Sequence, residues 1–197
     1  MPRARAAREG KTIMFMRTKH GVDRQVKKLR RLGINAEGIH GDKSQGARTR
    51  AITGFGDGSL PVLVATDIAA RGIDINDVSL VVHLDPPAEH KAYLHRAGRT
   101  ARAGTSGTVV TLVMDEQRKD VTQLMRKAGV EAKEIKVTPD SSELADITGA
   151  REFHGAPLPP PGQPQQKKSP QGGRPGRPNR PGAAKKSTHR GSRQRKR

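Results

Sequence analysis

Short apolar runs along this chain alternate with stretches in which apolar residues recur every three or four positions. Residues 12–16 (TIMFM) form a run that predicts a buried strand. Val22, Val26 and Leu29 then recur at helical spacing until Gly33, a residue type that commonly ends helices. The same alternation predicts strands at residues 34–40, 62–65, 80–84, 107–114 and 134–137, and helices at about residues 44–55, 88–96 and 115–129.

Strands that alternate with helices are typical of βαβ units. The predicted fold class is therefore α/β, with a parallel sheet and helices on both of its faces. In such sheets the carboxyl ends of the strands meet at one edge, and ligands bind there. Candidate functional residues are accordingly sought in the loops that follow the strands.

The composition changes sharply after His154. Residues 155–197 hold nine of the fourteen prolines, twelve Lys and Arg and no Asp or Glu, so they supply +12 of the net charge of +19. Such a segment buries too little apolar surface to offset the entropy of ordering, and we expect a disordered basic tail. A charge run of one sign favours a nucleic-acid-binding arm over a solubilising tail, because clustered cations bind phosphates by releasing counterions.

Composition also excludes several functional classes. The chain has no cysteine, which excludes a disulfide framework, thiolate zinc sites and a cysteine nucleophile. The histidines lack the spacing of a metal-binding motif, so no metal site is expected. No apolar run approaches the roughly 20 residues of a membrane span. We expect a soluble, cytoplasmic protein that does not engage a membrane.

The tripeptide Gly10-Lys11-Thr12 resembles the end of a phosphate-binding loop of the form G-x-x-x-x-G-K-[ST], but the pattern is incomplete. Arg5 stands where the first glycine is required, and the tripeptide precedes a predicted strand instead of following one. The sequence also lacks an acidic D-E-A-D type segment that could hold Mg²⁺. We therefore expect no nucleotide cradle in this chain.

Two segments combine residue types that suit phosphate chemistry. Residues 64–74 (VATDIAARGID) follow a predicted strand and contain a hydroxyl, two acids, an arginine and a glycine, although alone they fit an ordinary strand–helix connection equally well. Residues 95–102 (HRAGRTAR) place Arg99 and Arg102 on one side of a helical turn. Two neighbouring guanidinium groups match the charge and geometry of a terminal phosphate.

The order and spacing of these segments resemble the C-terminal RecA-like domain of DEAD-box RNA helicases. In that family an apolar strand with polar residues after it precedes the motifs H-G-D, Q-x-x-R, A-T-D-x-A-A-R-G-[IL]-D, D-x-P and H-R-x-G-R-T-x-R. The matching segments here are residues 13–19, 40–42, 45–48, 65–74, 85–87 and 95–102. The leading His95 of the last motif is typical of the DEAD-box branch, whose substrate is RNA.

The resemblance implies that five residues contact RNA. Thr18, Arg48, Thr66 and Arg71 match positions that hold the sugar–phosphate backbone in the family. Gly72 matches the position at which RNA approaches the main chain closely. RNA is therefore the expected partner.

The resemblance also implies roles in ATP hydrolysis. Asp74 matches the residue that contacts the ATP ribose and couples the two sites. Arg99 and Arg102 match catalytic arginine fingers that reach the γ-phosphate, and His95 and Arg96 match residues that help to join two domains. ATP and Mg²⁺ are implied as cofactors, bound mainly by a first RecA-like domain that is missing from this chain.

The predicted organisation has four parts: a disordered or truncated N-terminus (residues 1–9), the RecA-like domain (10–140), a domain end or linker (141–154) and the tail (155–197). Two functions stay open. The chain is either the C-terminal half of an ATP-dependent RNA helicase, inactive without the first domain, or a stand-alone RNA-binding or RNA-chaperone module without ATPase activity.

Overall fold

The computed structural model describes residues 4–7, 10–73, 75, 78–101, 106–138, 141–153 and 155–162. The chain divides into two compact units, Met1–Pro164 and Gln165–Arg197, and every described residue belongs to the first unit. The boundary that we expected after His154 therefore falls inside the first unit.

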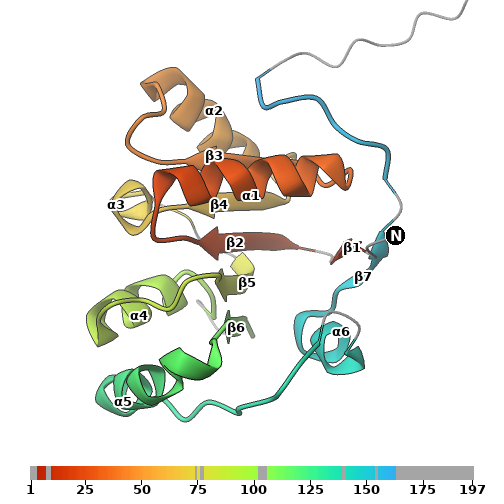
Figure 1. Ribbon diagram of the computed structural model, residues 1–197. Coiled ribbons are helices and arrows are strands. Elements are labelled where there is room, and N and C mark those ends of the chain that lie inside the picture. Colours follow the sequence, from red (N-terminus) through yellow and green to blue (C-terminus); the bar gives the residue numbers. More distant parts are fainter. Residues whose placement is uncertain are drawn as a thin grey trace, which may run out of the picture. The chain divides into compact units, whose positions relative to one another are not determined.

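The first unit is built on a five-stranded sheet in which every strand pair is parallel (Figure 1). All four residues of β4 (Val62–Ala65) are buried, which explains why their sequence is a continuous apolar run instead of an alternating pattern. The predicted parallel α/β fold is confirmed. The spatial order of the strands is β3 (Ala36–Ile39), β4 (Val62–Ala65), β2 (Lys11–Phe15), β5 (Val78–His83) and β6 (Thr108–Thr111).

The predicted helices are present and begin or end at the expected signals. Ser44 caps its helix by accepting a hydrogen bond from the N–H of Ala47 at 3.3 Å, and Gly129 ends another with a φ of +66°. No helix in the described ranges has the length and apolar content that crossing a bilayer requires. The helices are α1 (Lys19–Arg31), α2 (Gln45–Gly56), α3 (Asp67–Ala70), α4 (His90–Ala97), α5 (Arg118–Ala128, after a 3₁₀ turn at Asp115–Gln117) and α6 (Ser142–Thr148).

Helices cover both faces of the sheet and divide the core in two. Successive residues of a strand point to opposite faces. Leu63 of β4 thus packs in one cluster with Phe55 of α2, and the next residue, Val64, packs in the other with Val26 of α1. Burying both faces leaves the loops at the strand ends as the exposed, variable part of the domain.

A separate two-stranded sheet pairs the two ends of the unit. β1 (Ala4–Ala7) runs antiparallel to β7 (Arg151–Phe153), with Ala4 opposite Phe153. We expected residues 1–9 to be disordered or truncated, and the strand at residues 4–7 corrects that expectation. The partner strand lies at the far end of the unit, so no local pattern could indicate the pairing.

Residues 134–137 form no strand, so that prediction was wrong. Glu134 instead binds Arg118 at the start of α5, with 2.6 Å between Nε and Oε1. The Glu134 side chain is thus bound by a helix. A strand also needs a neighbouring strand to share its hydrogen bonds, and the local sequence does not specify whether one is present.

Residues 155–162 lie against the C-terminal end of α1. The N–H of Leu158 donates to the carbonyl oxygen of Arg30 at 2.8 Å, and the Arg30 side chain donates to the carbonyl oxygen of Pro159. Arg30 is only 7% exposed and also donates to the carbonyl oxygen of Ala36 at 3.2 Å. This segment therefore supplies an acceptor that a buried guanidinium needs.

Gly33 allows this close approach, which predicts an unequal response to two glycine substitutions. A β-carbon at Gly33 would stand 2.6 Å from the backbone of Gly155, whereas Gly58, with the same φ of +82°, has open space. We expect Gly33→Ala to lower the free energy of unfolding by about 1–3 kcal/mol more than Gly58→Ala, because only Gly33→Ala forces the segment away. Urea unfolding of both variants measures the difference, and equal losses would contradict the close approach.

Candidate functional site

The carboxyl ends of the parallel strands meet at one edge of the sheet, and the loops of this edge carry most of the predicted site residues. α1, α2 and α4 follow β2, β3 and β5, so each begins at this edge (Figure 1). The first turn of a helix has unpaired backbone N–H groups and a partial positive charge, which favour anions. The topology alone thus makes this edge suitable for phosphate groups.

Thr18 and Arg48 lie at the starts of α1 and α2. Thr18 is exposed, and its Oγ1 accepts a hydrogen bond from the N–H of Gly21 at 3.1 Å, so its own hydroxyl hydrogen can still be donated. Arg48 is half-buried, and its Nη2 lies 3.5 Å from the carbonyl oxygen of Ala69. Arg48 therefore reaches from α2 toward α3.

The connection after β4 supplies Thr66, Arg71 and Gly72. Thr66 immediately precedes α3, and Arg71 follows it with an exposed side chain. Gly72 has a φ of +73°, which L side chains rarely adopt, and no atom lies within 4 Å of where a β-carbon would stand. The main chain at Gly72 is therefore open to a ligand.

α4 brings His95 and Arg99 to the same edge. His95 is exposed, and Arg99 is half-buried and donates from Nη1 to the carbonyl oxygen of Ile73 at 2.7 Å. Both residues and Arg71 line one small hollow of about 20 Å³. The structure thus brings a predicted RNA residue and a predicted catalytic residue to one place.

Arg96 is buried, unlike its neighbour His95. Arg96 is 3% exposed, and its Nε and Nη2 donate to the two carboxylate oxygens of Asp67 at 2.6 and 2.7 Å. Its Nη1 donates to the carbonyl oxygen of Asp85 at 2.9 Å, and its guanidinium lies 5.0 Å from the centre of the Phe15 ring. The guanidinium of Arg96 is therefore engaged inside its own domain.

Sequence reasoning missed Asp67 and Phe15 as partners of Arg96. Asp67 was considered only as one of the two acids of residues 64–74, and Phe15 only as part of the predicted buried strand at residues 12–16. An ion pair between residues 29 positions apart leaves no signal in spacing or composition. The predicted residues Asp74 and Arg102 lie outside the described residues, so their roles stay predictions.

His83 lies in the core beside this pair. It is fully buried, its Nδ1 is 2.9 Å from Oγ1 of Thr111, and its ring packs edge-on against Phe15 and Tyr93. Burial, together with the positive charge of Arg96, lowers the pKa of His83 to about 3, with Asp67 opposing the shift. The imidazole is therefore neutral in the folded protein.

Comparisons with known proteins agree with this geometry. Residues 3–104 match the family described as helicase conserved C-terminal domain. The DEAD-box ATP-dependent RNA helicase 7 of Arabidopsis thaliana is 40% identical over 140 residues, which are 71% of this chain and 20% of that protein. This chain belongs to the DEAD-box RNA helicase family.

The DEAD-box chain spans about a fifth of the length of the curated relatives it matches, such as the Arabidopsis protein, of which it covers 20%. The ATP-dependent RNA helicase DBP2 of Debaryomyces hansenii is 44% identical over 128 residues, which are 64% of this chain and 24% of that protein. The match of residues 3–104 to the helicase conserved C-terminal domain identifies this part of the chain as a C-terminal RecA-like domain.

Solved structures confirm the RecA-like fold of this helicase domain. The Dbp5 protein of S. cerevisiae, bound to RNA and ADP BeF3, is 32% identical with a TM-score of 0.63, and the match covers 71% of this chain and 38% of that one. A DEAD box protein from the hyperthermophile Methanococcus jannaschii is 34% identical with a TM-score of 0.61, over 65% of this chain and 35% of that one.

Removing the acid of the buried ion pair is expected to destabilise the helicase domain. Asp67→Asn leaves the guanidinium of Arg96 without a counter-charge, and we expect a loss of about 2–3 kcal/mol, less than for a fully buried pair because the Asp67 side chain is 32% exposed. Denaturant unfolding measures the loss. Asp120→Asn, at an exposed position of α5, is the control and should change stability by less than about 0.5 kcal/mol.

The buried His83 predicts a specific loss of stability in acid. Because its folded pKa lies below its unfolded pKa, the unfolded chain takes up a proton first, and the domain loses stability as the pH falls from about 6.5 toward 3. Between pH 7 and pH 5 this loss amounts to about 2 kcal/mol. We expect His83→Leu to remove this part of the pH dependence, as measured by urea unfolding at both pH values.

The control for this measurement is His20→Leu, because His20 is exposed on α1. This variant should keep the full dependence on pH. If His83→Leu kept it as well, the imidazole of His83 would not be the titrating group.

Proposed function

We propose that this helicase domain supplies RNA-backbone contacts and a catalytic arginine to an ATP-dependent RNA helicase whose nucleotide cradle lies on a first RecA-like domain. The observation that carries the proposal is the gathering of Arg48, Thr66, Arg71 and Arg99 at one sheet edge, where α1, α2, α3 and α4 also begin. The chain alone is then inactive toward ATP.

The residues proposed to contact RNA suit its sugar–phosphate backbone, which carries no sequence information. Thr18, Thr66 and Arg71 offer hydroxyl and guanidinium donors, which fit phosphate oxygens. Stacking on bases needs exposed aromatic rings. Phe15 and Phe55 are at most 2% exposed and Tyr93 is 6% exposed, which supports contacts to the backbone over contacts to bases.

The proposed role in ATP hydrolysis requires a positive charge from this domain beside a nucleotide that is bound on the first RecA-like domain. Arg99 would stabilise the negative charge that develops on the transferred phosphoryl group. We assign the same role to Arg102, contact with the ATP ribose to Asp74, and contact with the first domain to the exposed His95. Arg96 is buried, so we propose that it acts on the domain interface by placing α3 and α4.

Mg²⁺ does not fit the described part of this chain. Within the residues that the structure describes, no group of three or more His, Asp or Glu side chains is placed to hold a metal ion. The metal is therefore proposed to bind with the nucleotide on the first domain, and no step is assigned to it here. A cytoplasmic location stays a prediction.

A second candidate function is a stand-alone RNA-binding or RNA-chaperone module. Residues 155–197 favour it, because they contain twelve Lys and Arg and no acid and so carry +12 of the net charge of +19. Binding through such a segment is electrostatic and falls steeply with salt. It requires neither Arg48 nor Arg99.

The test is RNA-stimulated ATP hydrolysis by this chain mixed with, or joined to, the first RecA-like domain of a DEAD-box relative. We expect no turnover by the chain alone and RNA-stimulated turnover in the combination. Arg99→Ala should lower that turnover by about a thousandfold, as the loss of an arginine finger does. Arg126→Ala, at an exposed arginine in the last turn of α5, is the matched control and should leave turnover unchanged.

Turnover by the chain alone would contradict the proposal, because it would require a nucleotide cradle in this chain. Absence of turnover in every combination, together with RNA binding that persists in Arg48→Ala, would favour the stand-alone module.

A further inference from the structure

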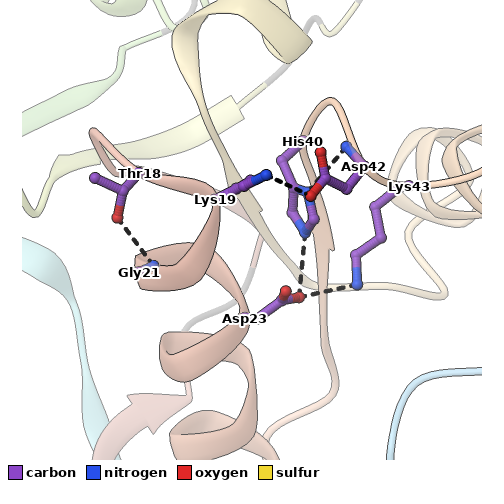
Figure 2. Close-up of polar contacts among 7 residues, drawn as sticks. All are labelled: Thr18, Lys19, Gly21, Asp23, His40, Asp42 and Lys43. Atoms are coloured by element: carbon purple, nitrogen blue, oxygen red, sulfur yellow. Dashed lines mark hydrogen bonds and ion pairs between the residues drawn. The ribbon is translucent and has the colours of Figure 1, made fainter.

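Three polar contacts join the first turns of α1 to the loop between β3 and α2 (Figure 2). Nζ of Lys19 lies 2.7 Å from Oδ2 of Asp42. Farther along α1, Oδ1 of Asp23 lies 2.9 Å from Nζ of Lys43 and 3.2 Å from Nε2 of His40. Figure 2 shows His40 and Lys43 pointing to the same carboxylate from the loop. Asp23 of α1 therefore contacts two side chains of the loop between β3 and α2.

His40 is the buried member of this group, with a side chain only 4% exposed. Its Nδ1 accepts from the N–H of Asp42 at 3.3 Å, so in the neutral ring the hydrogen is on Nε2, which faces Asp23. The Nε2–Oδ1 contact is close but lies off the line of a well-formed hydrogen bond. The imidazole is thus held between a loop amide and a carboxylate of α1.

Asp23 is ionised at neutral pH. Burial alone would raise the pKa of Asp23, but the hydrogen bond from Lys43, the close contact with His40 and the positive charge of Lys43 outweigh burial and lower it. The Asp23 side chain is 40% exposed, and ion pairs of such exposure contribute at most about 1 kcal/mol to stability. The main consequence of the contacts is therefore the relative placement of the loop and α1.

Both joined segments carry proposed RNA contacts. Thr18 caps α1, and Arg48 follows the capping residue Ser44 in the first turn of α2. We propose that Asp23 and His40 are positioning residues that hold the Thr18 end of α1 and the Arg48 turn of α2 at the separation an RNA backbone requires. This inference rests on the proposed function and deepens it.

Electrostatics alone predicts the opposite effect for Asp23. A carboxylate beside a polyanion repels it, so neutralising the acid should strengthen RNA binding. A positioning role requires that the same change weakens binding, because Thr18 and Arg48 no longer meet the backbone together. The sign of the change in affinity thus separates the two accounts.

The experiment measures binding of a short fluorescein-labelled oligouridylate to the full chain by fluorescence anisotropy at fixed salt. We expect Asp23→Asn to weaken binding about fivefold, the size of one lost hydrogen bond. Asp146→Asn, at an exposed position of α6, adds the same charge far from these contacts along the chain and should leave binding unchanged or slightly stronger. In an Arg48→Ala background, Asp23→Asn should have no further effect.

A second pair of variants separates the contacts of the two ring nitrogens of His40. In His40→Gln the amide nitrogen can take the place of Nε2, whereas in His40→Asn the amide oxygen can replace only Nδ1 and the contact to Asp23 is lost. We expect His40→Gln to bind like the unaltered chain and His40→Asn to bind like Asp23→Asn. Thermal unfolding of each variant shows whether the fold is intact.

Each outcome either supports or overturns the positioning role of Asp23 and His40. If Asp23→Asn binds as tightly as Asp146→Asn while Arg48→Ala weakens binding, the positioning role is wrong and the proposed function stands. Equal weakening by Asp23→Asn with and without Arg48 means a general structural effect and also overturns the inference. If Arg48→Ala itself changes nothing, the proposed RNA contact fails, and the positioning role fails with it.

Discussion

The guanidinium group of Arg96 is the contact on which the rest of the carboxyl edge depends. A buried cation is tolerated only when an opposite charge and enough acceptors surround it. Asp67 of α3 provides both carboxylate oxygens, the chain after β5 provides the carbonyl oxygen of Asp85, and β2 provides the ring of Phe15. One side chain of α4 thereby sets the positions of three other elements. Asp67 directly follows Thr66, which is proposed to contact RNA, and Arg96 lies three residues before Arg99, which is proposed to act on ATP.

Much of this arrangement could be predicted from the sequence, because a parallel sheet imposes strong and simple patterns. Strands buried on both faces read as apolar runs, and β4 is the clearest case. Ser44 and Gly129 mark helix ends by local hydrogen bonding and backbone conformation. Once the strands are placed, chain direction alone assigns the following loops to one edge. This is why Thr66 and Arg71, far from Thr18 in sequence, lie at the same edge.

The remaining features depend on contacts between distant residues. His95 and Arg96 are adjacent, yet the first is exposed and the second is 3% exposed, because successive helical residues point in directions about 100° apart. The motif alone does not say which one faces inward. The pairing of β1 with β7 and the docking of residues 155–162 on α1 likewise consist mainly of backbone contacts, which any sequence of suitable flexibility could make. From composition alone, residues 1–9 were expected to be disordered or truncated, residues 141–154 to end the domain or form a linker, and residues 155–162 to belong to the disordered tail.

Under the proposed function, the same contacts restrict the ways in which RNA binding can stimulate ATP hydrolysis. α3, which adjoins the proposed RNA residues, is joined to α4 by two short hydrogen bonds between Asp67 and Arg96, and Arg99 binds the carbonyl oxygen of Ile73 just beyond α3. A ligand on the RNA side cannot change the position of Arg99 within the domain without breaking these bonds. Under the proposed function, we therefore expect coupling between the two ligands to arise between domains, through a shift toward a closed arrangement that both ligands favour. In that proposed arrangement Arg99 would move with the domain as part of a rigid body, and its placement would depend on the ion pair between Arg96 and Asp67.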